Sequence, residues 1–405
     1  MSDRPSGPLA GVRVLELGSF IAGPFSGQLL GDYGAEVIKV ESPGDGDPMR
    51  RWGVTHNGDS LWWPSIARNK RSVTLDLRSE RARAVLPRLA AGCDIVVENF
   101  RPGRLAEWGL DYAALSADNP ALVLVHISGF GQTGPRAADA GFGSIGEAMG
   151  GIRHTTGNPD LPPTRTGVSL GDALAAMFGV IGALAALTEA RSSGRGQEVD
   201  VAIYEAVAAL MESSMADFEL GGVLRGRTGS VLPGVSPSNV YPTRDGDEVL
   251  IAANADAVFA RLCTAMGRPE LATDERYATH GARGERMEEL DALIARWTAT
   301  MTADEALAVL EEHGVPAGQI YTAKQMLTDP HYLARDMVER IRSFQGWDVP
   351  VTGVVPKFGR TPGSIRSAGP VLGADTDDVL RTVAGLADDE VATLRADGLL
   401  GRGPA

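Results

Sequence analysis

Short apolar strands alternate with helical segments through the N-terminal third of the chain. Strands are expected at residues 12–17, 36–41, 72–77, 94–98 and 121–127, with helices at 25–33 and 79–91 between them. Parallel strands need a crossover connection, usually a helix, so this order predicts an α/β fold built on a parallel, doubly wound sheet. In such a sheet, ligands bind in the crevice at the carboxyl ends of the strands.

The first strand–helix turn lacks the glycine spacing of a dinucleotide site. Its glycines are Gly18 and Gly23, whereas the nicotinamide and flavin fingerprint is Gly-x-Gly-x-x-Gly. Glu41 closes the second strand where a ribose-binding acid would lie. That acid alone does not make the motif, so the sequence argues against a nicotinamide or flavin enzyme.

The charge and the cysteine content of the 405-residue chain argue against several other classes. The formal net charge is −14, whereas nucleic acids and anionic membranes are bound through basic surfaces, so neither is an expected partner. The two cysteines, Cys93 and Cys263, are typical of a reducing compartment. The first residues carry no apolar secretory segment, and we expect a cytoplasmic protein. The six histidines share no metal-binding spacing, so no metal site is expected.

One carboxylate stands at the start of the most apolar stretch of the chain. Asp172 precedes a 15-residue run, 173–187, that is shorter than a membrane span of about 20 residues and predicts a buried core helix. Gly179 and Gly182 would let a neighbouring element approach this helix closely. Asp172 could be the N-cap of the helix. The same place, near the positive end of the helix dipole, also suits an ionised covalent nucleophile.

Changes in composition divide the chain. The stretch 221–242 is rich in glycine and proline, and we interpret it as a linker after a first domain of residues 1–220. A smaller domain is expected at 243–327. Residues 328–405 are then expected to return to the first domain.

Further elements are expected in all three parts. Thr302 and Glu305 form a capping-box pattern at the start of a helix that Gly314 ends. A final amphipathic segment is expected at 375–398. The remaining elements are strands at 198–202 and 248–253 and helices at 203–216, 256–266, 286–300 and 303–313.

Basic residues gather in the loops next to the predicted strands. In an acidic chain this clustering suggests a pocket for a large anion, although solvated surface charge is the commoner reason for a single basic residue. His126, near the end of a strand, could be a general base or a structurally satisfied histidine. The basic clusters lie at residues 50–51, 68–71 and 99–104.

Several motifs, in this order along the chain, resemble the class III coenzyme A (CoA) transferase family. The resemblance covers nearly the whole chain. It implies a large Rossmann-like domain made from both chain ends, a smaller inserted α+β domain, and a homodimer whose subunits interlock like links of a chain. The motifs are Ala-Gly-Pro at 22–24, Leu-Gly-Asp-Tyr-Gly-Ala-Glu-Val-Ile-Lys-Val-Glu at 30–41, Asn-Lys-Arg-Ser at 69–72, Val-Glu-Asn-Phe-Arg-Pro-Gly at 97–103, Ser-Leu-Gly-Asp at 169–172, Gly-Arg-Gly-Gln at 194–197, Asp-Pro-His at 329–331 and Thr-Pro-Gly at 361–363.

The resemblance also implies functional residues. Asp172 matches the aspartate that becomes acylated, and CoA would be substrate and product, with no tightly bound cofactor. Ser42, Glu107 and Ala140 occupy positions that are basic in formyl-CoA transferase. The family's glycine-rich loop over the active site is not evident, and residues 232–239 are the nearest stretch. The positions that match the CoA site are Phe20, Ile21, Arg68, Asn69, Lys70, Asn99, Phe100 and Arg101.

Two segments resemble the branch that moves CoA from succinyl-CoA to acids such as malate or glutarate. They are residues 142–152 and 165–169. Arg165 could pair with the distal carboxylate of a dicarboxylic acid, or it could be structural. The backbone N–H groups of the loop formed by Gly141, Phe142 and Gly143 are candidate oxyanion donors.

Two alternatives to CoA transfer stay open. A 2-methylacyl-CoA racemase needs an acid and a base on opposite faces of the α-carbon, and family racemases resemble one another in Ala-Gly-His-Asp. Here the stretch is Ala-Gly-Phe-Gly at 140–143, which lacks both groups and favours transfer. The remote alternative is a protein that binds CoA without catalysis.

Overall fold

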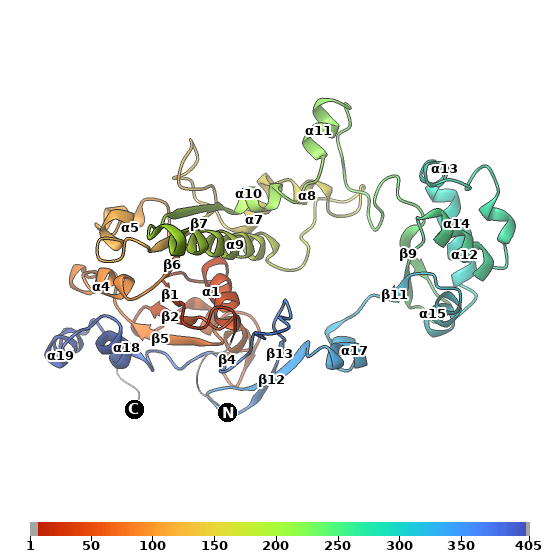
Figure 1. Ribbon diagram of the computed structural model, residues 1–405. Coiled ribbons are helices and arrows are strands. Elements are labelled where there is room, and N and C mark those ends of the chain that lie inside the picture. The colour runs from red at the N-terminus through yellow and green to blue at the C-terminus, as the bar shows by residue number, and fades with distance from the viewer. Residues whose placement is uncertain (1–6, 402–405) are drawn as a thin grey trace. The chain divides into compact units, whose positions relative to one another are not determined.

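The computed structural model describes residues 7–401, and the largest sheet within them has six parallel strands (Figure 1). The strand order is β5-β2-β1-β6-β7-β8. Counted along this sheet, it is the order 3-2-1-4-5-6 of the doubly wound fold, so the predicted parallel α/β sheet is confirmed. The strands are β1 Arg13–Glu16, β2 Glu36–Glu41, β5 Lys70–Thr74, β6 Ile95–Glu98, β7 Val123–Ser128 and β8 Glu198–Ala202.

Helices cover both faces of this sheet. Successive strand residues point to opposite faces, so Val14 belongs to one hydrophobic core and Leu15 to the other. Burial on both faces explains why the strands are continuous runs of valine, isoleucine and leucine. Helices α1 Ala22–Asp32, α9 Leu170–Ser193 and α10 Ile203–Ala208 cover one face, and α4 Leu86–Ala91, α18 Thr376–Thr382 and α19 Asp388–Ala396 cover the other.

Helix α9 extends beyond the predicted 173–187 at both ends. A Cβ atom at Gly182 would lie 2.6 Å from Val199 Cγ1, and one at Gly179 would lie 3.2 Å from Ile127 Cδ1. The two glycines therefore let α9 lie close to β8 and β7, as expected from the sequence. Gly194, with φ +76°, ends the helix in a left-handed C-cap. By length and composition α9 is able to cross a membrane, and half of its most apolar stretch is buried in the protein.

The chain divides into two units. Unit 1 holds the residues up to Ile152, Thr166–Ser214 and those from Pro330 onward, and unit 2 holds Arg153–Arg165 and Met215–Asp329. Unit 2 contains the three-stranded antiparallel sheet β11-β10-β9. Its elements are β9 Ser238–Pro242, β10 Glu248–Ala252, β11 Ala317–Gln319, α12 Asp256–Ala265, α13 His280–Glu285, α14 Met287–Thr298, α15 Ala303–Glu312 and α16 Ala323–Met326, with a 3₁₀ turn at Pro269–Ala272.

The end of the predicted linker is a strand. Residues 238–242 form β9, because Tyr241 is buried in the core of unit 2 and its hydroxyl donates to Asp291 Oδ1 at 2.6 Å. The glycine- and proline-rich composition that suggested a linker therefore applies to 221–237. In the same unit, Thr302 and Glu305 form the predicted capping box of α15.

Two predicted helices are interrupted and one strand is displaced. Helix 79–91 breaks into α3 Glu80–Arg83 and α4, where Pro87 lies in the first turn and has no N–H to continue the earlier helix. Helix 203–216 ends early, and Glu212, with φ +51°, precedes α11 Ser214–Glu219. Strand β5 begins at Lys70, two residues before the predicted start.

The C-terminal segment covers the edge strand β5. Ser72 N donates to Asp375 Oδ2 at 2.9 Å, and Thr74 N donates to Thr376 Oγ1 at 3.0 Å. The remaining elements are a 3₁₀ turn at Pro48–Arg50, β3 Thr55–His56, β4 Asp59–Ser60, α2 Trp63–Ile66, α5 Arg104–Glu107, α6 Tyr112–Leu115, α7 Gly143–Met149, α8 Ile152–Thr155, α17 Pro330–Ala334, β12 Val338–Arg342 and β13 Asp348–Thr352.

Candidate functional site

A pocket of about 310 Å³ opens at the carboxyl edge of the sheet. The strand order reverses between β1 and β6, which is where a doubly wound sheet binds its ligand. The walls of the pocket come from the segments that follow β1, β2, β5 and β6. They include Leu17, Gly18, Ser19, Ser42, Gly46, Pro48, Leu75, Leu77, Arg78, Phe100 and Trp108.

Asn99 joins two of these segments across the reversal point. Its Oδ1 accepts from Ser19 N at 2.8 Å, and its Nδ2 donates to Ser19 O at 2.9 Å. Phe100, the next residue, packs edge to face on Trp108 with ring centroids 5.4 Å apart. Both residues were predicted for the CoA site, and Phe100 lines the pocket.

Phe20 and Ile21 lie on the segment after β1. Phe20 is partly exposed, has φ +62°, and donates its N–H to Asp47 Oδ1 at 3.3 Å. The rings of Phe20 and Trp52 pack edge to face, with their centroids 5.8 Å apart. A left-handed backbone conformation is rare and strained for phenylalanine. The hydrogen bond to Asp47 stabilises this conformation of Phe20.

Two exposed arginines lie on the same edge of the sheet. Arg101, predicted for the CoA site, donates to Ala138 O at 3.0 Å. Arg78 lines the pocket, and its side chain, 85% exposed, pairs with Asp76 at 2.8 Å. The sequence analysis missed Arg78, although its place directly after the predicted strand 72–77 was a usable signal. Glu107, at a position that is basic in formyl-CoA transferase, instead pairs with Arg104 at 2.8 Å.

Three predicted CoA-site residues are buried and have internal partners. Arg68 is 2% exposed, and its Nε donates to Asp32 Oδ1 at 2.9 Å. Asn69 Nδ2 donates to the same carboxylate at 2.9 Å. Lys70 is fully buried and lies 2.7 Å from Glu16 Oε2. The cationic side chains of Arg68 and Lys70 therefore pair inside unit 1 and do not reach the pocket surface.

Lys70 belongs to a buried charge cluster beneath the pocket. Lys39 Nζ lies 2.8 Å from Glu16 Oε1 and 2.8 Å from Asp47 Oδ2. Burial lowers the pKa of Lys70 to about 8, and the charge of Lys39 adds to this effect. Burial also disfavours charged Lys39, but the surrounding carboxylates outweigh it and raise its pKa. The cluster connects β1, β2 and β5 to the 3₁₀ turn that Asp47 caps.

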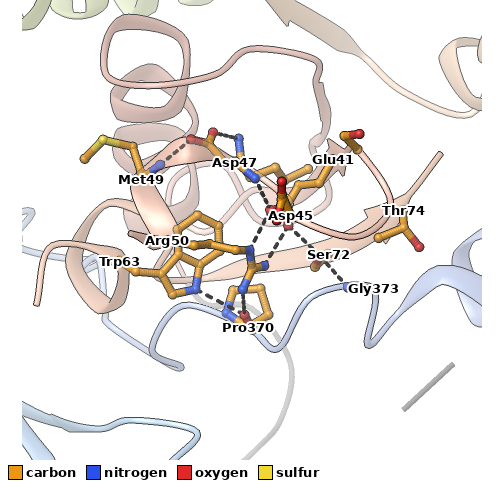
Figure 2. A network of polar contacts seen from close by, with 12 residues as sticks. Glu41, Asp45, Asp47, Met49, Arg50, Trp63, Ser72, Thr74, Pro370 and Gly373 are labelled. Atoms are coloured by element: carbon orange, nitrogen blue, oxygen red, sulfur yellow. Dashed lines mark hydrogen bonds and ion pairs between the residues drawn. The ribbon is translucent and has the colours of Figure 1, made fainter. Parts of the chain in front are cut away.

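Both carboxylate oxygens of Glu41 accept hydrogen bonds from other residues of the protein (Figure 2). Arg50 donates to both of its oxygens at 2.8 Å, and Ser72 Oγ donates to Oε1 at 2.6 Å. The Arg50 guanidinium lies over the Trp63 ring, 3.9 Å from its centroid, and Arg50 also donates to Pro370 O at 3.1 Å. The carboxylate that ends β2 is thus unavailable to a ribose, in agreement with the missing dinucleotide fingerprint.

Asp172 lies in the first turn of α9, and Ser169, not Asp172, is the N-cap. The alternative in which Asp172 is the N-cap is therefore wrong, because the helix starts at Leu170. A Cβ atom at Gly143 would lie 2.8 Å from the carboxylate carbon of Asp172. Gly171 N donates to Glu147 Oε1 at 3.3 Å. The starts of α7 and α9 thus meet around a half-buried carboxylate, and only a glycine fits at 143.

The loop before α7 presents one ring to solvent between two closely packed glycines. Phe142 is 72% exposed, whereas a Cβ atom at Gly141 would lie 3.0 Å from the Phe130 ring. The structure therefore brings Gly143 to Asp172, while Phe142 points outward. Arg165 is exposed and ends the Arg153–Arg165 piece of unit 2, whereas Asp172 belongs to unit 1.

Within residues 7–401, no group of three His, Cys, Asp or Glu side chains is arranged to hold a metal ion. His126 has two glutamate neighbours and is not among the residues found around Asp172. Cys93 and Cys263 are both buried, free thiols.

A doubly wound sheet with a pocket at its carboxyl edge, and without the dinucleotide fingerprint, defines the class as a doubly wound α/β protein. The chain belongs to CoA-transferase family III, whose family model matches residues 9–376. The family and the enzyme class inferred from the sequence are thereby confirmed.

Individual relatives cover almost the whole chain. It is 55% identical over 396 residues to the succinyl-CoA–D-citramalate CoA-transferase of Chloroflexus aurantiacus, covering 98% of each protein. It is 39% identical to the alpha subunit of the succinyl-CoA–L-malate CoA-transferase of Chloroflexus aurantiacus, covering 96% of this chain and 92% of that one. The crystal structure of a CAIB/BAIF family protein from Brucella suis superposes with a TM-score of 0.82 at 36% identity, covering 93% of this chain and 100% of that one.

Proposed function

We propose that this chain transfers CoA from succinyl-CoA, or another dicarboxyl-CoA, to a dicarboxylic acid, and that Asp172 carries the covalent intermediate. The observation that carries the substrate proposal is the 55% identity, over nearly the full length, with a transferase named for succinyl-CoA and D-citramalate. A C5 hydroxydicarboxylate of this type is the acceptor we propose.

The Asp172 carboxylate begins the reaction as a nucleophile. It attacks the thioester carbonyl, the C–S bond breaks, and a mixed anhydride and the CoA thiolate form. The thiolate attacks the aspartyl carbonyl, which releases succinate and leaves an aspartyl–CoA thioester. The acceptor carboxylate attacks that thioester, and the freed thiolate then takes the acceptor's acyl group from the new anhydride. Asp172 is regenerated without any cofactor besides CoA.

The surroundings of Asp172 support this role. It lies in the first turn of α9, where the helix dipole stabilises a carboxylate anion. Gly143 packs against the carboxylate, where a side chain would collide with it. The backbone N–H groups of the loop at Gly141–Gly143 remain our candidates for stabilising the oxyanion.

We place the nucleotide end of CoA in the pocket at the carboxyl edge of the sheet. Phe20, Ile21, Asn99, Phe100 and Arg101 lie on the segments around it, and Arg78 supplies a further cation. Arg68, Asn69 and Lys70 contribute by holding β5 and its neighbours in place, because their polar groups are paired internally. Arg165 stays the proposed partner of the distal carboxylate.

The test is a CoA-exchange assay with succinyl-CoA and a panel of acids that includes D-citramalate, L-malate, glutarate and acetate. We expect exchange with the dicarboxylates and little with acetate. Asp172→Ala should lower turnover by at least about 10³-fold. In the presence of succinyl-CoA, hydroxylamine should displace the CoA thiolate from the aspartyl–CoA thioester and leave a hydroxamate adduct on the Asp172 peptide of the wild type. Full turnover in the Asp172→Ala variant, or an adduct elsewhere, contradicts the nucleophile assignment.

We further propose that the protein works as an interlocked homodimer in the cytoplasm. The outward face of α9 supports an interface, because Met177, Phe178 and Ile181 are 37–61% exposed apolar side chains. Two free, buried thiols are compatible with a reducing compartment. Light scattering on the purified protein should give twice the chain mass, and a monomer at micromolar concentration contradicts the dimer.

A further inference from the structure

His126 forms a charged row with two glutamates that the proposed reaction does not use. It is 7% exposed in the middle of β7. Its Nδ1 contacts Glu98 Oε1 on β6, and its Nε2 lies 3.2 Å from Glu198 Oε1 on β8. The inner glutamate, Glu98, is 3% exposed, whereas the Glu198 side chain is 54% exposed. Because His126 contacts Glu98 directly, it can affect the contacts that the Glu98 carboxylate makes.

Glu98 holds the backbone of the pocket wall. Its second oxygen, Oε2, accepts from Phe100 N at 2.6 Å. Phe100 lines the pocket and packs on Trp108. Asn99, between the two, holds the Ser19 segment. The orientation of the Glu98 carboxylate therefore fixes the start of the loop 99–101, which carries three of the predicted CoA-site residues.

We propose that His126 is a positioning residue for acyl-CoA binding, because it fixes the Glu98 carboxylate that in turn orients Phe100 and its loop. The proposal rests on the proposed function of the pocket as the site of the CoA nucleotide. His126 touches neither substrate nor Asp172 in this role. Its effect is on the affinity for acyl-CoA and not on the transfer steps.

The charges around His126 make this positioning dependent on pH. Burial disfavours the imidazolium, but the hydrogen bonds and charges of Glu98 and Glu198 outweigh it and raise the pKa of His126 above 6.5. Asp200 is its register partner on β8 and accepts from Gln132 N at 2.8 Å. Tyr112 donates its hydroxyl to Leu122 O; burial and the charge of Glu198 raise the pKa of Tyr112, and Arg195 opposes them.

The direction of the pH effect on acyl-CoA affinity follows from the raised pKa of His126. Below it, both ring nitrogens of His126 carry protons and bond to the two glutamates. As pH rises through it, one proton and the positive charge are lost, and the hold on Glu98 weakens. The affinity for acyl-CoA should therefore fall on the alkaline side, and the stability that the ion pairs contribute should be lost over the same range.

The experiment measures KM and kcat for succinyl-CoA from about pH 6 upward, over the range in which the enzyme stays folded, because the pKa of His126 is raised above 6.5. In the wild type, KM should rise about threefold to tenfold across the range, as expected for weakening one hydrogen-bonded contact. In His126→Gln, which keeps a donor but has no titrating ring, KM should be raised at low pH and independent of pH. The kcat values of the two proteins should stay similar. His56→Gln, which removes an exposed histidine of the same unit, is the matched control and should behave as wild type.

A second variant keeps the test informative if His126→Gln folds poorly. Glu198→Gln removes the outer, half-exposed charge and should shift the KM transition to lower pH without removing it. A KM transition that persists unchanged in both variants overturns the positioning role. Phe100→Ala tests the proposed nucleotide site separately from the positioning role. If Phe100→Ala leaves KM unchanged, the pocket is not the nucleotide site. If Phe100→Ala raises KM while His126→Gln keeps the wild-type pH profile, only the positioning role is overturned.

Discussion

Two sets of charged side chains near the carboxyl edge of the sheet differ in their burial and in their partners. Lys39, Lys70 and Glu41 lie within strands, are at most 4% exposed, and have partners inside the protein. Arg78 and Arg101 follow the strands, are exposed, and lie on the pocket side. The sequence motifs of the family contain members of both sets.

The difference teaches that a basic residue's role here depends on whether it lies within a strand or beyond the strand's end. A side chain inside a strand of this sheet is covered by helices on both faces, so its charge must be neutralised where it stands. A side chain just beyond the strand end reaches solvent and is available to an anionic ligand. Lys70 and Arg78 are eight positions apart and illustrate the two outcomes.

The largest effect should come from breaking the inner set. Lys70→Met removes one partner of a buried ion pair and leaves Glu16 under-compensated, which should lower the free energy of unfolding by about 3–5 kcal/mol. Urea titration measures this loss. Lys357→Met, at an exposed position of the same unit, is the control and should change stability little. A stable Lys70→Met protein with a raised KM for acyl-CoA would instead place Lys70 with the outer set.

The next largest effect should come from displacing the Asp172 carboxylate. Gly143→Ala places a methyl group against the Asp172 carboxylate, 2.8 Å from its carbon, and should displace the nucleophile. Misplacement of a reacting group lowers turnover by about 10²-fold. The unfolding midpoint should move far less than in Lys70→Met. Gly134→Ala is a poor control because of its positive φ, so Ala148→Gly, on the same helix α7, is preferable. Wild-type turnover in Gly143→Ala would show that the carboxylate tolerates displacement.

The outer set should affect binding alone. Arg78→Ala and Arg101→Ala should each raise KM for succinyl-CoA by about tenfold, the loss of roughly one charge-assisted contact, with kcat and stability nearly unchanged. Arg81→Ala, an exposed arginine that pairs with Asp397 and does not line the pocket, should leave KM as in wild type. A large loss of stability in Arg78→Ala alongside the raised KM would erase the distinction between the two sets.

The smallest expected effect is on how the free energy of unfolding changes with pH. Because the pKa of Lys70 is lowered to about 8 in the folded protein, the unfolded chain binds more protons between that value and the ordinary value of 10.5. The free energy of unfolding should therefore rise with pH in this interval through Lys70. Urea titrations of wild type and Lys70→Met at intervals from pH 8 to about 10 isolate the contribution as a difference in slope. Parallel curves would mean that Lys70 titrates alike in both states.

Local patterns in the sequence predicted elements whose signals are local. Strand 36–41 was predicted with the observed bounds, and so was 198–202. The Thr302 capping box and the glycine approach of α9 were also predicted correctly, because a cap and a close approach depend on the nearest residues. The resemblance to the family identified the enzyme class and pointed to Asp172.

Pairing between distant residues could not be predicted in this way. Lys70 and Arg68 looked like ligands for an anion because their partners, Glu16 and Asp32, lie far away along the chain. Strand β5 starts at Lys70, whereas local alternation placed its start two residues later. The role of Gly143 needed the convergence of α7 and α9, which only the folded chain displays.

The cover over β5 has a consequence for synthesis of the chain. The hydrogen bonds of Ser72 and Thr74 to this cover join residues 303 and 302 positions apart. Ribosomes add about 5–20 residues per second, so the edge of β5 emerges roughly 15–60 s before the segment that covers it. During that interval the nascent sheet carries an open strand able to pair with other chains. A truncated chain that ends before Gly373 lacks this cover and should accumulate as aggregate.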